Sequence, residues 1–139
     1  MKNKTDILLL LLLLHYSKKP IKGRTRLQKI VCVLKEKFHV PFDFKFRPYY
    51  YGPYSNDLSD SLSLLEGTNL VNETSEVLGR LAVRYNYELT EKGREMAEAI
   101  ISKINNKKFL EDFEEHLTEI QQIPTQELIS LSKKISGID

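Results

Sequence analysis

The sequence predicts a mostly α fold with one small β-hairpin, an α+β arrangement, and two features of the chain lead to this expectation. Apolar residues recur at helical spacing along most of the chain. One stretch, residues 80–90 (RLAVRYNYELT), instead alternates apolar and polar residues, as a half-buried strand does. At 139 residues, with 41% hydrophobic and 29% charged residues, the chain has the composition of a globular domain with a real core.

The first expected helix holds an unbroken apolar run from Ile7 to Leu14. Thr5 or Asp6 is placed to cap its start, and Pro20 follows its end near Ser17. Lysines before an apolar run also occur in secretion signals, but a helix of this length rises only about 12 Å, against about 30 Å for a bilayer core. No small-residue cleavage site follows it. We therefore expect a helix buried on every side and no membrane partner.

The second expected helix begins at Thr25, which can cap it, and carries one continuous apolar stripe. The stripe consists of Leu27, Ile30, Val31, Leu34 and Phe38. After this helix, Pro41, Pro48 and alternating phenylalanines favour an extended segment. Gly52 and Pro53 predict a turn at its end.

A third helix is expected between Ser55, which can cap it, and Gly67, which ends it. Its buried side carries three leucines at helical spacing. Its outer side is polar and consists of Asn56, Asp57, Ser59, Asp60 and Ser63. The outer side has no lysine or arginine.

A β-hairpin follows from Leu70, with its tip near residues 74–79 (TSEVLG) and an exposed face that carries Arg80 and Arg84. Thr90 can cap a fourth helix, which residues 105–108 (NNKK) break. Two further amphipathic helices are expected after that break, and a proline separates them.

Three helices, a two-stranded hairpin and a closing helix form the order of a winged helix-turn-helix domain. Residues 55–73 (SNDLSDSLSLLEGTNLVNE) and 84–100 (RYNYELTEKGREMAEAI) resemble the reader helix, wing and Leu-Thr-x-x-Gly helix start of the PadR and MarR transcription regulators. Residues 21–38 (IKGRTRLQKIVCVLKEKF) with 49–58 (YYYGPYSNDL) resemble the YwgA-like winged-helix proteins more closely, and the antitoxin-associated Panacea domain more distantly. These resemblances cover residues 7–104. They imply a winged-helix fold, which hosts DNA, RNA and protein contacts alike.

Positive charge is concentrated in one part of the chain, although the net charge is only +2. Residues 17–37 hold eight lysines and arginines against one glutamate. With the winged-helix resemblance, this predicts a DNA-binding transcriptional regulator whose partner is double-stranded DNA. The expected phosphate contacts are Lys22, Arg24, Arg26, Lys29, Arg80 and Arg84, and the residues expected nearest the bases are Asn56, Ser59 and Ser63. The other interpretation of the basic run is a solvated loop and helix face.

The acidic third helix motivates an alternative function. Asp57 and Asp60 oppose a close approach to phosphates, so this helix is a poor main anchor for a duplex. In the alternative, the chain is a protein-interaction module, antitoxin-like or an adaptor, in which Asp57 and Asp60 dock on a basic partner without DNA binding.

No residue pattern indicates catalysis, so we expect neither an enzyme nor a cofactor. Cys32 lies beside an apolar stripe and is expected to be an inert buried thiol. Asp112 and His116 have a spacing that could hold a metal, but two ligands on an acidic helix are expected to be solvated. Four clustered tyrosines could stack on unpaired nucleotides, but in a domain of this size we expect them to pack. These tyrosines are Tyr49, Tyr50, Tyr51 and Tyr54.

We expect residues 1–106 to form the winged-helix domain and residues 107–139 to form a C-terminal helical extension. The first helix and the amphipathic segment from Phe109 offer more apolar surface than one small core needs, which predicts a homodimer joined through them. The single cysteine is compatible with a reducing compartment, and we expect the protein in the cytoplasm.

Overall fold

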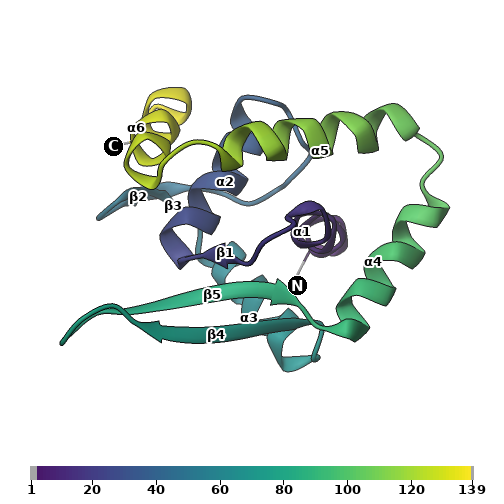
Figure 1. The fold of residues 1–139 in the computed structure, drawn as a ribbon. Helices are drawn as coiled ribbons and strands as arrows, with labels where there is room; N and C mark the ends of the chain where they lie inside the picture. Colours follow the sequence, from purple (N-terminus) through teal and green to yellow (C-terminus); the bar gives the residue numbers. More distant parts are fainter. Residues whose placement is uncertain (1–2, 139) are drawn as a thin grey trace.

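The computed structural model describes residues 3–138, and within this range the chain forms six helices and five strands (Figure 1). The helices are α1 (Lys4–Tyr16), α2 (Arg24–Glu36), α3 (Asn56–Gly67), α4 (Glu91–Lys103), α5 (Lys107–Gln121) and α6 (Thr125–Ser136). The strands are β1 (Ile21–Lys22), β2 (Arg47–Tyr49), β3 (Gly52–Tyr54), β4 (Val71–Val77) and β5 (Val83–Leu89). The expected combination of many helices with little antiparallel sheet is confirmed.

The larger sheet has three antiparallel strands in the order β1-β5-β4. β4 and β5 form the expected hairpin, which starts with Val71 opposite Leu89. β1 is too short to show in the sequence pattern, yet its two residues pair with β5, and the next amide, that of Gly23, donates to the carbonyl of Tyr85 at 3.0 Å. This short strand ties the start of α2 to the hairpin.

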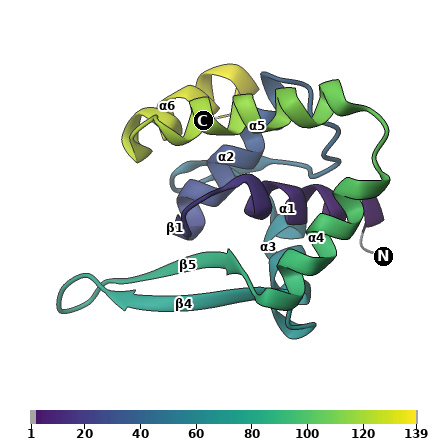
Figure 2. The ribbon, with the colours of Figure 1, turned by 45° about the vertical axis from the view of Figure 1, so that its right-hand side comes forward.

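The leucine-rich helix α1 lies at the centre of the fold (Figure 2). It packs against α4, α5 and β5, and every residue from Leu9 to Leu14 is buried. The expectation of a helix buried on every side is therefore confirmed for this run. No helix in residues 3–138 combines the length and the apolar character that a membrane span requires.

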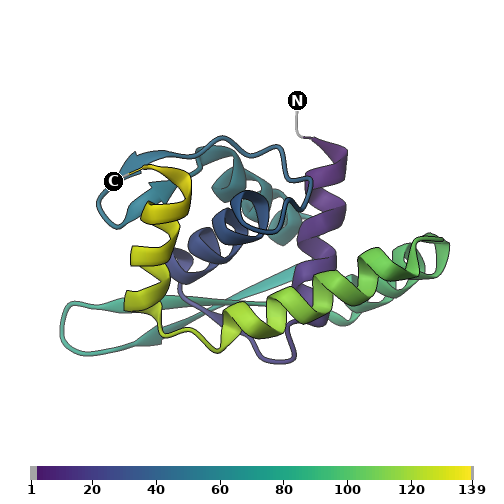
Figure 3. The same ribbon diagram turned by 90° about the horizontal axis from the view of Figure 1, so that it is seen from above.

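The two C-terminal helices belong to the same hydrophobic core as α1 and α2. Leu110, Phe113 and Leu117 of α5 join that core, and α6 packs along α2 and against β3 (Figure 3). The apolar surfaces that motivated the expectation of a homodimer therefore lie inside one chain. The segment after residue 106 is packed onto the preceding helices and shares their core.

Two helices begin at residues other than the expected caps. Asn3 caps α1, because its side chain accepts hydrogen bonds from the amides of Thr5 and Asp6. Asp6 is instead buried, which raises the pKa of its carboxyl, and it accepts a hydrogen bond from the amide of Asp43 at 2.7 Å. The N-cap of α2 is Gly23 at a φ of 105°, so the expected cap residue, Thr25, lies inside the first turn.

The caps of α3 and α4 are the expected ones. The hydroxyl of Ser55 accepts from the amide of Leu58, and that of Thr90 accepts from the amide of Gly93. A Cβ on Gly93 would lie 2.0 Å from the carbonyl oxygen of Leu70, so only glycine allows the first turn of α4 to approach the loop between α3 and β4 this closely.

Both hairpins turn at residues other than the expected ones. The β2–β3 turn consists of Tyr50 and Tyr51, while Gly52 and Pro53 lie in β3. The β4–β5 hairpin is longer than expected, and its loop spans residues 78–82. Arg80 therefore lies in this loop and not on a strand face.

Candidate nucleic-acid interface

Several of the expected phosphate-contacting residues meet at one cavity between the start of α2 and β5. This cavity, called the basic hollow below, has a volume of about 570 Å³. It is lined by Lys22, Gly23, Arg24, Thr25, Arg26, Leu78, Val83, Arg84, Tyr85 and Thr125. No side chain caps the start of α2, so its first amides can offer hydrogen bonds to an anion in the hollow.

A second cavity, of about 520 Å³, continues the basic surface toward the loop after α1. It lies beside the end of α5, and its cationic lining consists of Lys18, Lys19, Lys22 and Arg26. Because Lys22 and Arg26 line both cavities, the cations of residues 18–26 and Arg84 form one continuous surface. The cations of the loop after α1, the start of α2 and β5 are therefore brought together on one side of the molecule.

Arg24 is held in place by contacts with both strands of the hairpin. Its Nε donates to the hydroxyl of Tyr87 at 2.9 Å, and its Nη2 lies 3.5 Å from the carboxylate of Glu73. Its guanidinium stacks over the ring of Tyr85 at 4.1 Å from the ring centroid. The side chain nevertheless remains 55% exposed, so part of the guanidinium faces solvent.

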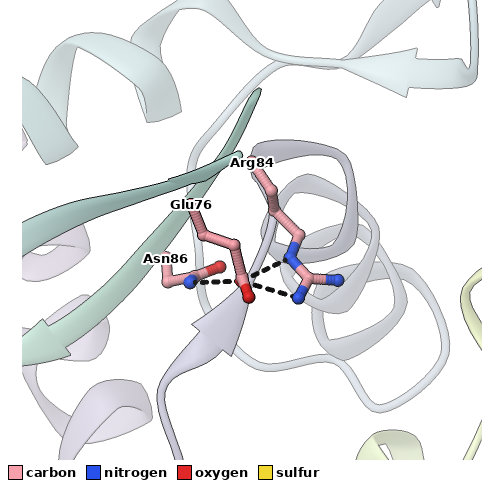
Figure 4. Close-up of polar contacts among 3 residues, drawn as sticks. All are labelled: Glu76, Arg84 and Asn86. Carbon is pink, nitrogen blue, oxygen red and sulfur yellow. Dashed lines mark hydrogen bonds and ion pairs between the residues drawn. The ribbon is translucent and has the colours of Figure 1, made fainter. Parts of the chain in front are cut away.

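Arg84 is held by a network across the hairpin (Figure 4). Its Nε and Nη2 donate to one carboxylate oxygen of Glu76 at 3.0 and 2.6 Å, and the side-chain amide of Asn86 donates to the same oxygen at 3.0 Å. Hydrogen bonds from Asn86 and Arg84 lower the pKa of Glu76, so it is ionised at neutral pH. Arg24 and Arg84 are therefore each partly neutralised by a glutamate of β4, Glu73 and Glu76 respectively.

Arg26 and Lys29 have structural contacts that sequence reasoning did not foresee. The guanidinium of Arg26 donates to the carbonyls of Gln121 and Ile123 at 2.9 and 2.8 Å and so binds the end of α5. Lys29 is only 2% exposed, and its ammonium donates to the carbonyl of Pro53 at 2.6 Å. This corrects the expectation for Lys29, because a buried ammonium cannot reach a phosphate.

The remaining expected contact, Arg80, does not line the hollow and lies exposed in the β4–β5 loop. Its neighbours Val77, Leu78 and Leu81 are also exposed, and Leu81 is 100% exposed. The tip therefore combines one cation with several apolar side chains.

The residues expected nearest the bases lie at positions i, i+3 and i+7 of α3, on one face of that helix. Asn56 is exposed at the start of α3, whereas Ser59 and Ser63 line a polar pocket of about 190 Å³ between α3, α2 and the hairpin. Arg24 lines the same pocket. Asp57 and Asp60, the residues of the alternative protein contact, are exposed.

The four tyrosines near the β2–β3 turn depart most clearly from expectation. Tyr49, Tyr50 and Tyr51 are 50%, 85% and 60% exposed, so the expectation that they pack is wrong for these three. Tyr54 is half-buried and lies 4.7 Å from Tyr49 between ring centroids. A two-residue turn made of tyrosines leaves both rings outside, which the sequence pattern did not reveal.

The side chains considered for chemistry have other roles. Cys32 is fully buried, as expected, and burial raises the pKa of its thiol to about 11. His116 stacks on Phe38 with ring centroids 3.9 Å apart, and Asp112 accepts from Lys108 at 3.0 Å. Within residues 3–138, no group of three or more His, Cys, Asp and Glu side chains is arranged to hold a metal ion.

No protein family model matches the chain. Part of the chain is similar to a curated protein, the "Uncharacterized protein YwgA" of Bacillus subtilis (strain 168), with 37% identity over 71 residues. The matched part makes up 51% of this chain and 42% of YwgA, so the chain spans less than half the length of that relative. This partial similarity agrees with the likeness to YwgA-like proteins, and the name of that relative assigns no activity.

Proposed function

We propose that this protein is a cytoplasmic winged-helix protein that binds double-stranded DNA as a transcriptional regulator. The observation that carries the proposal is the basic hollow, where Lys22, Arg24 and Arg84 surround the uncapped start of α2. Cationic side chains and free helix amides around one cavity suit a phosphate group, and phosphate contacts supply most of the affinity for duplex DNA.

The arrangement of the elements supports the winged-helix assignment. The chain order of three helices, a hairpin and a closing helix is that of this motif, with the β2–β3 hairpin inserted before α3. β1 adds a third strand beside the hairpin and fixes α2 against it. In this assignment α3 is the reader helix and the β4–β5 hairpin is the wing.

The division of roles within the proposed interface follows from the contacts described above. Lys22, Arg24 and Arg84 bind phosphates at the hollow, and Arg80 reaches a further phosphate from the wing tip. Arg26 adds positive charge at the rim, although its guanidinium is mainly engaged with α5. Asn56 is the exposed candidate for a base edge, because an asparagine amide can pair with adenine.

A charge-reversal experiment tests the proposal. Replacing Arg80 and Arg84 together with glutamate is expected to abolish binding to a duplex of mixed sequence, because both phosphate contacts then become repulsive. The matched control is Lys103→Glu combined with Lys107→Glu, the same total charge change on exposed residues at the end of α4 and the start of α5, at the end of the molecule away from the wing tip (Figure 1). The affinity of wild type should also fall steeply with salt. In a plot of the logarithm of the binding constant against the logarithm of the salt concentration, each phosphate contact should add about one unit to the negative slope. Duplex binding that survives the double substitution would refute the model with this wing.

A second candidate function has its own observation, the exposed acidic face of α3. Asp57 and Asp60 lie on that face, where they could contact a basic partner protein. If this is the function, Asp57→Lys combined with Asp60→Lys should release a protein that co-purifies with wild type. Retention of that partner by the double variant would count against the acidic face.

A further inference from the structure

The β2–β3 hairpin has no role in the proposed duplex interface, yet it carries the most exposed aromatic cluster of the described residues. We infer that this hairpin, called the tyrosine hairpin below, is a stacking platform for unpaired nucleotides of a single-stranded nucleic acid. This inference goes beyond the proposed function and does not depend on it, because it involves different residues and a different form of nucleic acid. The platform consists of Arg47, Tyr49, Tyr50, Tyr51 and Tyr54.

The geometry of the rings supports stacking. Tyr49 lies 5.0 Å from Tyr50 and 4.7 Å from Tyr54 between ring centroids, so three rings form a continuous row. Tyr50, at the turn, is 85% exposed. Exposed aromatic rings can stack on bases of any sequence, since every base has a π-face.

The hairpin is also held in a fixed position, which preserves the arrangement of its rings. α6 packs against β3, and the aliphatic part of Lys133 lies directly over Gly52, where a Cβ would come within 3.1 Å of its Cγ. On the inner side the buried ammonium of Lys29 binds the carbonyl of Pro53. A platform fixed from both sides loses little conformational entropy when a base stacks on it.

The charges around the rings favour an anionic partner. Arg47 is exposed and pairs across the hairpin with Tyr54, so both side chains share one face with Tyr49. Lys133 and the buried Lys29 lie close enough together that their charges repel, and this repulsion adds to burial in lowering the pKa of Lys29. Positive charge beside exposed rings suits a polymer of phosphates and flat bases. An acidic protein surface would use the charge but would gain less from the row of rings.

The test compares two single strands that differ only in their bases. One is an oligothymidylate of about twelve nucleotides, a typical site length, and the other has the same length of sugar and phosphate without bases. We expect the oligothymidylate to bind at least about tenfold more tightly, since each stacked base contributes about 1–3 kcal/mol. The chain has seven tyrosines and no tryptophan, so stacking should also quench its tyrosine fluorescence. Equal affinity for the two strands would overturn the inference and would indicate simple charge attraction.

Substitutions at the turn locate the effect. Tyr50→Ser should weaken oligothymidylate binding by roughly tenfold, whereas Tyr50→Phe, which keeps the ring, should retain the affinity. Leu81→Ser is the control, because it removes a large side chain that is 100% exposed, against 85% for Tyr50, from the other hairpin. Since the Tyr50 side chain is almost fully exposed, its removal should leave the circular dichroism and the unfolding midpoint unchanged. Unaltered oligothymidylate binding by Tyr50→Ser would overturn the inference. Duplex binding by the Arg80 and Arg84 double variant tests the proposed function and leaves this inference unaffected.

Discussion

Two sides of α2 use cations of the same run in different ways. On the side of the hairpin, Arg24 lies half-exposed over Tyr85 and lines the basic hollow. On the side of the C-terminal helices, Arg26 donates to backbone carbonyls at and just after the end of α5. Lys29 donates to a backbone carbonyl of β3, so both cations stabilise contacts within the fold. The difference shows that a basic segment does not act as a unit, because the neighbour that each side chain meets decides whether its charge is available to a partner.

The largest expected effect is a loss of stability, and it tests the side of α2 that faces the C-terminal helices. Arg26→Ala removes charged hydrogen bonds to the carbonyl of Gln121, the last residue of α5, and to that of Ile123 in the loop after it, and should lower the free energy of unfolding by about 3 kcal/mol. Arg24→Ala, the control on the other side of the helix, should lower it by about half as much, since it removes one short charged hydrogen bond, to Tyr87, together with a cation–π contact and a long ion pair of a side chain that is 55% exposed. Urea unfolding of both variants measures the contrast. Equal losses would break the distinction between the two sides.

A pH dependence sharpens the distinction for Lys29. Burial lowers its pKa from 10.5 to about 8, so between these values the unfolded chain holds this proton more tightly than the native protein does. The contribution of Lys29 to the free energy of unfolding therefore increases as the pH rises from 8 through 10.5. Lys29→Met cannot titrate at this position. Between about pH 7 and about pH 10, the free energy of unfolding of wild type should therefore rise by roughly 2 kcal/mol relative to that of Lys29→Met.

Urea titrations of wild type and Lys29→Met at both pH values measure this change. Other groups also titrate in this range, but they are shared by the two proteins and cancel in the comparison. A stability difference that does not vary with pH would mean that Lys29 is not buried as a charged group.

The smallest expected effect concerns the hairpin side of α2, and it is an increase in DNA affinity where most substitutions would cause a decrease. Glu76→Gln removes the carboxylate that holds Arg84, so duplex DNA should bind roughly threefold more tightly if Arg84 contacts phosphate. Glu98→Gln, which neutralises an exposed acid of α4, is the control and should change affinity less. Fluorescence anisotropy at fixed salt measures both. A weaker complex with Glu76→Gln would show that the carboxylate positions Arg84 for binding.

Much of the secondary structure could be predicted because helix spacing and strand alternation are local properties. The burial of Leu9 to Leu14, the caps at Ser55 and Thr90, and the existence of the hairpin all follow from short stretches of sequence. Lys29 could not be placed in this way, since it lies on the polar face of its own helix and becomes internal only when β3 covers it. β1 was missed because two residues carry no period.

The candidate site was predictable in part for the same reason. The cluster of cations around the start of α2 follows from the sequence, and the structure places four of the expected phosphate contacts, Lys22, Arg24, Arg26 and Arg84, on one cavity. Arg24 pairs with Glu73 and Arg84 pairs with Glu76. These pairs depend on the register of β4 against β5, which the sequence pattern does not predict to the residue. The exposure of the tyrosines depends on which two residues form a turn.

The central position of α1 has a consequence for biosynthesis. The leucine run is synthesised roughly a hundred residues before α5, which is part of its cover, and this is a delay of about 5–20 s at usual translation rates. During that interval the apolar run of α1 is exposed on the nascent chain. A ribosome-associated chaperone would therefore find a natural binding stretch in the leucine run of α1.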